Sequence, residues 1–227
     1  MEIPPEAPRE ELVRDQQGRL KERKFTLNGK PEGEYTSYYG SGQALVRLTF
    51  VNGKKEGEAL SWYPDGQLRE KGYFRNDKLE GEYLSWYESG QLHEREEYRN
   101  GLLDGPYAFY FRNGQLRDEE HFRKGKFEGE YRSWYKNGVL KEKGAFRNDR
   151  REGEYWGYDR NGRLREKALY KKGRLVGKFE SFGGDNTADH GPAGQEPPWN
   201  REEEEAREER EHAVDNLLKD LKQLDPQ

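Results

Sequence analysis

Apolar and polar residues alternate in short runs along most of the chain, and turn-forming residues separate these runs. In the run Tyr83-Leu84-Ser85-Trp86-Tyr87, an extended backbone places the first, third and fifth residues on one face and Leu84 and Trp86 on the other. The runs are about six to eight residues long and rich in Tyr, Trp and Phe, which favours strands and is too short for helices. The pattern therefore predicts a mostly β protein.

Glycines mark a repeat of 24 residues that extends from about residue 15 to residue 182. Asn-Gly and Asp-Gly pairs recur at its turns, and they supply the positive φ that tight hairpin turns require. Each unit is therefore predicted to be a β-hairpin. The two glycine series are Gly33, Gly57, Gly81, Gly105, Gly129, Gly153 and Gly177, and Gly18, Gly42, Gly66, Gly90, Gly114, Gly138 and Gly162.

Successive hairpins predict an elongated, single-layer antiparallel β-meander of six to seven units. A propeller blade needs four strands in about 40 residues or more, which does not fit a 24-residue unit. A parallel β-helix has an aliphatic interior, whereas these strands carry Glu, Arg and Lys between their aromatic residues.

The repeat turns each aromatic position into a ladder across neighbouring strands. A single layer leaves a face uncovered, and a row of partly exposed aromatics is typical of an interaction surface. Two interpretations of the ladder that contains Trp86 stay open: it binds a partner, because its same-face neighbours vary widely, or it is the core of the sheet. One ladder is Tyr35, Tyr83, Tyr107, Tyr131 and Tyr155, with Ser neighbours, and the other includes Trp62, Trp86, Tyr110, Trp134 and Tyr158.

Composition excludes several functions. The 227 residues include no Cys, so disulfides, Cys-ligated metals and thiol catalysis are absent. The four His residues share no repeat position, and the repeated Ser61, Ser85 and Ser133 have no His in phase, which argues against a catalytic triad. Glutamates recur as turn residues rather than as a unique pair. We therefore predict no enzyme activity, metal or cofactor.

The start of the chain has no basic segment followed by an apolar one, so we predict no signal peptide. No apolar run approaches the roughly 18 residues of a membrane helix. The prediction is a cytoplasmic protein, and removal of an export signal stays open as an alternative.

The unit Asn-Gly-Lys-x-Glu-Gly-Glu-Tyr-x-Ser-Trp-Tyr-x-x-Gly-Gln-Leu resembles the bacterial MORN-variant repeat, best at residues 53–68, 81–92 and 125–140. The resemblance implies an elongated antiparallel sheet. Many bacterial relatives are named antitoxins of toxin–antitoxin systems, and eukaryotic proteins with the related repeat are scaffolds, some proposed to bind anionic lipids. Pro106 and Asp159 depart from the pattern, and the resemblance carries over no functional residues.

The segments outside the repeats differ in composition. Residues 1–14 are rich in Pro and Glu and are predicted to be a disordered arm, and residues 183–199 to be a linker. Residues 200–224 predict an amphipathic helix that either caps the last hairpin or recruits a partner. Residues 12–184 hold 35 basic and 28 acidic residues, whereas residues 185–227 hold five basic and thirteen acidic ones. The apolar stripe of the helix is Ala213, Val214, Leu217, Leu218, Leu221 and Leu224.

These observations predict a non-enzymatic protein-binding repeat module, in its most concrete form an antitoxin-like protein that sequesters a partner protein such as a toxin. The alternative is a structural scaffold that associates with anionic membrane lipids. Nucleic acid is not expected as a partner, because basic residues alternate with acidic ones. The candidate partner-binding residues are Leu60, Trp62, Leu84, Trp86, Tyr110, Arg132, Trp134, Trp156, Tyr158, Leu217 and Leu221.

Overall fold

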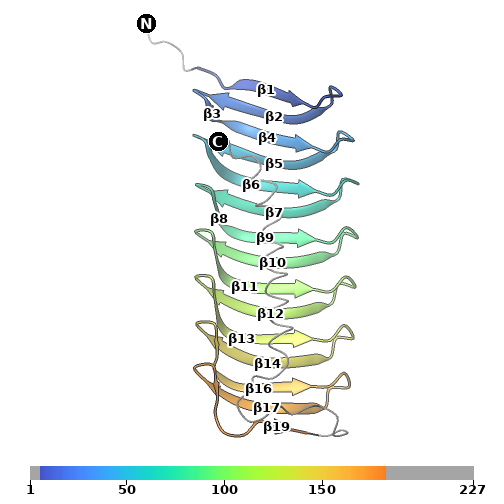
Figure 1. Cartoon of the computed structure of the whole chain (residues 1–227), viewed down its shortest axis with the longest axis vertical. Helices are drawn as coiled ribbons and strands as arrows, with labels where there is room; N and C mark the ends of the chain where they lie inside the picture. The colour runs from blue at the N-terminus through green and yellow to red at the C-terminus, as the bar shows by residue number, and fades with distance from the viewer. Residues whose placement is uncertain (1–5, 183–227) are drawn as a thin grey trace. The chain divides into compact units, whose positions relative to one another are not determined.

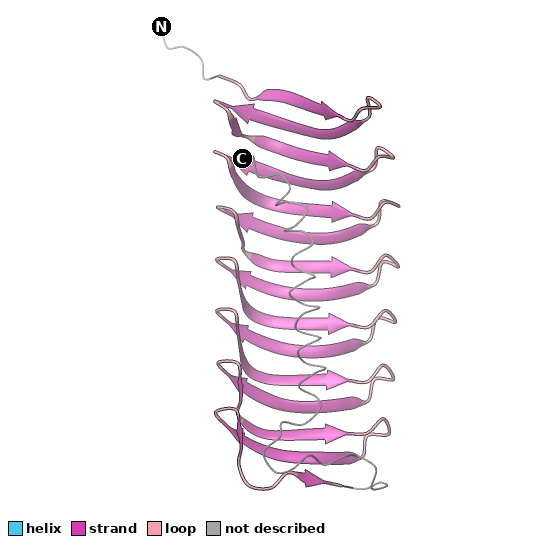
Figure 2. Ribbon diagram, viewed as in Figure 1, coloured by secondary structure: helices cyan, strands magenta, loops and turns pink. Residues whose placement is uncertain are grey.

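The computed structural model describes residues 6–182, which form one antiparallel sheet of 19 strands (Figure 1). Each long strand pairs with the next one along the chain, so the sheet is an open meander, as the repeat predicts. No helix occurs among the described residues (Figure 2). The predicted linker at 183–199 and helix at 200–224 lie outside them.

The strands follow one another along residues 9–181. They are β1 (Arg9–Arg14), β2 (Leu20–Leu27), β3 (Lys30–Pro31), β4 (Gly33–Tyr38), β5 (Ala44–Val51), β6 (Lys54–Trp62), β7 (Leu68–Arg75), β8 (Lys78–Leu79), β9 (Gly81–Trp86), β10 (Leu92–Arg99), β11 (Leu102–Tyr110), β12 (Leu116–Arg123), β13 (Lys126–Trp134), β14 (Leu140–Arg147), β15 (Arg150–Arg151), β16 (Gly153–Tyr158), β17 (Leu164–Lys171), β18 (Arg174–Leu175) and β19 (Glu180–Ser181).

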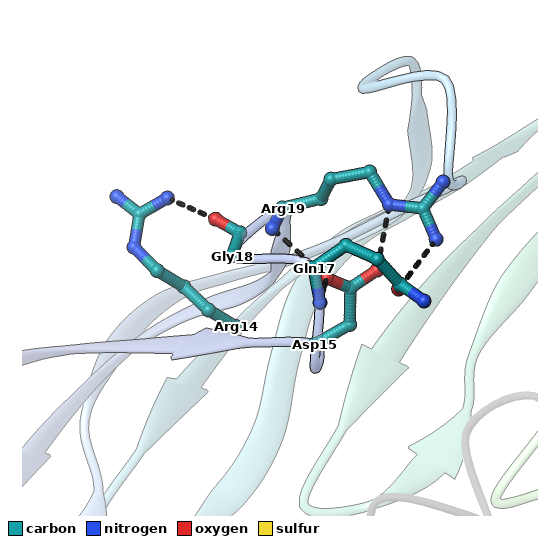
Figure 3. A network of polar contacts seen from close by, with 5 residues as sticks. All are labelled: Arg14, Asp15, Gln17, Gly18 and Arg19. Carbon is teal, nitrogen blue, oxygen red and sulfur yellow. Dashed lines mark hydrogen bonds and ion pairs between the residues drawn. The ribbon is translucent and has the colours of Figure 1, made fainter.

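For residues 9–14, strand β1 corrects the expectation of a disordered arm at residues 1–14. Strand β1 pairs with β2 along its whole length. The turn between them is closed by Asp15, whose carboxylate accepts hydrogen bonds from the Arg19 amide at 2.9 Å and from Arg19 Nε at 2.7 Å (Figure 3). Arg14 donates to the Gly18 carbonyl at 3.0 Å. This strand lacks the aromatic residues of the later units, so its composition does not indicate a strand.

Turns at the two ends of the hairpins join neighbouring repeats. At one end, the Tyr87 amide donates to the Gln91 carbonyl at 2.9 Å. At the other end, the Gly101 amide donates to the Leu79 carbonyl of the preceding turn at 2.9 Å. There the carboxylate of the Glu-Gly step accepts a bond from the main-chain amide twenty residues later, which gives these glutamates a structural role. The acceptor and donor pairs are Glu32 and Asn52, Glu56 and Asn76, Glu80 and Asn100, Glu128 and Asn148, and Glu152 and Lys172.

The Glu-Gly step also interrupts every second long strand or bends it. Strand β8 ends at Leu79 and β9 begins at Gly81, whose φ is 78°. The pairing of β7 shifts across this point, from Phe74 opposite Leu79 to Glu70 opposite Ser85. Such a bulge bends a strand. The bend at each Glu-Gly step curves the sheet, so that side chains on one face pack together as a core.

We call the face that carries Tyr83 and Ser85 the inner face, and the opposite face, which carries Leu84 and Trp86, the outer face. On the inner face, each buried tyrosine packs against an aromatic ring of the next strand with centroids 5.0 to 6.4 Å apart. This repeated contact is the core. The pairs are Tyr35 and Phe50, Tyr83 and Tyr98, Tyr107 and Phe122, Tyr131 and Phe146, and Tyr155 and Tyr170.

Carboxylates lie buried beside these rings. Glu94 is fully buried and accepts hydrogen bonds from the hydroxyls of Ser85 and Tyr107, both at 3.2 Å. Glu142 repeats the arrangement with Ser133 and Tyr155, both at 3.1 Å. Because a buried carboxylate is costly unless it is hydrogen-bonded, these Ser and Tyr donors explain why the core tolerates glutamate.

Candidate functional site

On the outer face, one continuous cross-strand row holds four of the candidate residues, Leu60, Leu84, Arg132 and Trp156. Leu60 lies opposite Lys71, which in turn lies opposite Leu84. The same cross-strand pairing continues through successive strands to Trp156. The row has one member on each long strand from β6 to β16 (Figure 1).

A second row on this face is aromatic. Its members are neither buried nor fully exposed, whereas the tyrosines of the inner face are buried. The backbone of this row is fixed by tyrosine hydroxyls of the preceding repeat, since Tyr63 donates to the Trp86 carbonyl at 2.7 Å and Tyr87 to that of Tyr110 at 2.7 Å. The row consists of Trp62, Trp86, Tyr110, Trp134 and Tyr158.

The charged residues of this face form two lines of opposite sign: the basic line lies within the row that holds Leu60 and Lys71, and the acidic line lies next to that row, on the side away from Trp62. Lys71 Nζ lies 2.9 Å from a Glu58 carboxylate oxygen, and Arg95 Nε lies 2.8 Å from Glu82. The hydrogen bond with Glu58 raises the pKa of Lys71. Because these groups are exposed to solvent, each pair contributes little to the stability of the sheet. The basic line is Arg23, Arg47, Lys71, Arg95, Lys143 and Lys167, and the acidic line is Glu34, Glu58, Glu82, Glu130 and Glu154.

Arg132 marks the place where this order is reversed. Glu119 occupies the basic line there, and the Arg132 guanidinium contacts it at 3.2 Å and Glu130 at 2.7 Å. Arg132 is also exposed, whereas Leu60 and Leu84 at the equivalent positions are partly buried. The charge pattern of the outer face therefore changes at this repeat.

Trp156 lies between two cations. Lys143 Nζ is 4.9 Å and Lys167 Nζ is 4.6 Å from its ring centroid. Arg47 similarly covers the Trp62 ring at 5.6 Å. These contacts show that basic side chains line up next to the aromatic row. Prediction from the sequence noted only that basic and acidic residues alternate along the chain, and so missed this line of basic side chains. Their spacing of 24 residues, from Arg47 through Lys71 to Lys167, is the signal that reveals them.

The sequence also missed a contact on the inner face. His93 is the extra residue of a bulge in β10, and its Nδ1 lies 3.3 Å from Ser85 Oγ and 3.8 Å from a Glu94 carboxylate oxygen. Burial, followed by Arg112 and Arg117, lowers the pKa of His93 to about 4. A catalytic triad uses both ring nitrogens of its histidine, whereas here the same nitrogen faces both groups. The cluster is therefore a packing feature.

Three further observations concern residues and chemistry outside these rows. Leu217 and Leu221 lie outside the described residues. Among residues 6–182, no three His, Cys, Asp or Glu side chains are grouped so as to hold a metal ion. In the same part of the chain, no helix has the length and apolar character to cross a membrane.

Comparison with known proteins identifies the repeats. No curated protein matches the chain. A solved structure titled "Crystal Structure of TcdB2-TccC3" is similar at 14% identity and a TM-score of 0.16, over 73% of this chain and 13% of that chain. The family model described as "MORN repeat variant" matches residues 55–76, 79–100, 103–124 and 127–148. Four consecutive segments of the sheet therefore match the MORN repeat variant, a type of repeat that generally binds proteins or lipids.

Proposed function

We propose that this chain is a non-enzymatic module that binds another protein along the outer face of its sheet. The observation that carries the proposal is the aromatic row from Trp62 to Tyr158, which is partly exposed and has no second layer over it among the described residues. Trp, Tyr and Arg are the residues that most often dominate protein interfaces, and all three occur on this face.

The charge arrangement supports a protein as the partner. The basic and acidic lines run side by side and are joined by ion pairs such as Lys71–Glu58 and Arg95–Glu82. Nucleic acid and anionic lipid both favour a surface of one sign. A protein surface with both charge signs and apolar contacts suits this face better.

Sequestration is the finer form of the proposal. A partner that covers several repeats at once would be held by many small contacts and kept from its own targets, as an antitoxin holds a toxin. Variation beside the aromatic row, with Leu60, Leu84, Arg132 and Trp156 at equivalent positions, would select that partner.

A lipid-associated scaffold is the second candidate. It is favoured by the local pair of lysines around Trp156, because a ring between two cations suits an anionic headgroup at an interface. In contrast to protein binding, such an association weakens steeply with salt.

The test is the double substitution Leu84→Ala with Trp156→Ala in the full chain, which spares the row from Trp62 to Tyr158. Affinity capture followed by mass spectrometry should lose the partner, while the melting temperature stays within a few degrees. The matched control is Leu102→Ala with Leu175→Ala, which removes two exposed leucines next to hairpin turns, outside the two rows of candidate residues, and should keep the partner. Equal capture by both variants would place the contact elsewhere, and salt-sensitive sedimentation with anionic vesicles would favour the scaffold.

A further inference from the structure

We propose that Asn28 is a site of spontaneous deamidation, at which the side-chain amide is lost and aspartate or isoaspartate is formed. Six Asn-Gly pairs occur in the described residues, and this dipeptide is the sequence context in which the following backbone nitrogen is least hindered. The pairs begin at Asn28, Asn52, Asn100, Asn113, Asn137 and Asn161.

The reaction needs a free backbone nitrogen. The nitrogen of the glycine loses its proton to water and attacks Cγ of the asparagine, a C–N bond forms, and ammonia leaves. Water then opens the resulting succinimide at either carbonyl, so the net change consumes one water and releases one ammonia. A glycine amide that donates a hydrogen bond within the fold must break that bond before its nitrogen can attack, so the reaction there is slower.

Five of the six glycine amides are held in this way. Gly53 donates to the Pro31 carbonyl and Gly101 to that of Leu79, both at 2.9 Å. The remaining donors and acceptors are Gly114 and Phe111, Gly138 and Tyr135, and Gly162 and Asp159, at 2.8 to 3.0 Å.

The Asn28-Gly29 turn differs from the others. Neither of its two amides donates a hydrogen bond to any residue that the structure describes. Pro8 stands 24 residues before Glu32, the residue whose carboxylate accepts the Asn52 amide at 2.6 Å, so the acceptor for the Asn28 amide is missing.

The surroundings of the two turns differ as well. A methyl group built on Gly29 would touch nothing within 4 Å, whereas the Lys30 side chain lies 3.6 Å from that position on Gly53. Asn28 and Gly29 are both exposed to solvent. Water and base therefore reach the reacting atoms at Asn28 freely.

Asn52 is a matched internal control. Its context, Val-Asn-Gly-Lys, differs from Leu-Asn-Gly-Lys around Asn28 by one aliphatic residue, and the two asparagines share a φ of 52°. The intrinsic rates of the two sites should therefore be similar. The loss of one ordinary hydrogen bond changes a rate by about two- to tenfold, so two missing bonds predict deamidation at Asn28 that is about five- to a hundredfold faster than at Asn52.

The experiment incubates the full chain in mildly alkaline buffer and follows each Asn-Gly peptide by mass spectrometry, natively and in denaturant. The expected result is similar rates in denaturant and a selective native reaction at Asn28. Substitution of Glu32 by Ala should speed the reaction at Asn52 and leave Asn28 unchanged. Equal native rates at Asn28 and Asn52, or a faster reaction at Asn113, would overturn the proposal. Because Asn28 lies off the outer face, neither result bears on partner capture.

Discussion

The two faces of the sheet are built from the same strands but use their residues differently. On the inner face Tyr107 is 1% exposed, packs on Phe122 and donates to buried Glu94. On the outer face Tyr73 is 49% exposed and the charged residues form half-exposed pairs. The inner face therefore holds the buried contacts that stabilise this single-layer sheet, whereas the outer face presents partly exposed side chains.

The largest expected effect is at the inner tyrosines. Tyr107→Ala should lower the free energy of unfolding by about 3–5 kcal/mol, because it empties a packed position and removes a hydrogen-bond donor from Glu94. Tyr73→Ala on the outer face should change it by less than about 1 kcal/mol. Urea unfolding of both variants measures the difference, and equal losses would contradict the division between the faces.

Gly144→Ala tests how closely the inner face is packed. A Cβ at Gly144 would lie 2.6 Å from a ring carbon of Tyr131, so the variant should lose about 1–3 kcal/mol of unfolding free energy. Gly40→Ala is the control, because its Cβ would meet only the end of the flexible Arg19 side chain, at 3.4 Å. We expect a change within about 0.5 kcal/mol there. A tolerated alanine at Gly144 would show that the tyrosine ladder is loosely packed.

His93 makes the stability of the inner face depend on pH. Its pKa is about 4 in the fold and 6.5 in a model compound, so the unfolded chain binds the proton more readily. The stability that His93 contributes is therefore fully present above about pH 6.5 and is lost as the pH falls toward 4, by an amount on the order of 1–3 kcal/mol. Melting temperatures across this range should fall less in His93→Gln than in the parent chain. Parallel curves would show that His93 is not buried as neutral imidazole.

The smallest effect is expected for the ion pairs of the outer face. A double-mutant cycle on Lys71 and Glu58 should give a coupling in the small range that is typical of solvent-exposed ion pairs, and this coupling should fall with salt. Urea unfolding at low and high ionic strength provides the four stabilities. A coupling well above this range, unaffected by salt, would mean that the outer face contributes to stability as the inner face does.

Local chemistry made the strands and turns predictable. Asn-Gly pairs set the tight turns, and alternation in the run from Tyr83 to Tyr87 placed Tyr83 and Ser85 on the buried face and Leu84 and Trp86 on the other, where the structure has them. Strand β1 escaped prediction because it contributes no residue to the aromatic ladders. Its backbone pairing with β2 holds it in the sheet.

The period of 24 residues, the hairpin of each unit and the two-faced strands follow from the local sequence, because they depend on turn residues and on alternation within a few positions. The burial of Glu94 depends on the folded sheet, since its donors Ser85 and Tyr107 come from the two neighbouring strands. The contact of His93 with Ser85 also depends on the folded sheet, because a bulge moves one side chain across the sheet without leaving a pattern in the sequence.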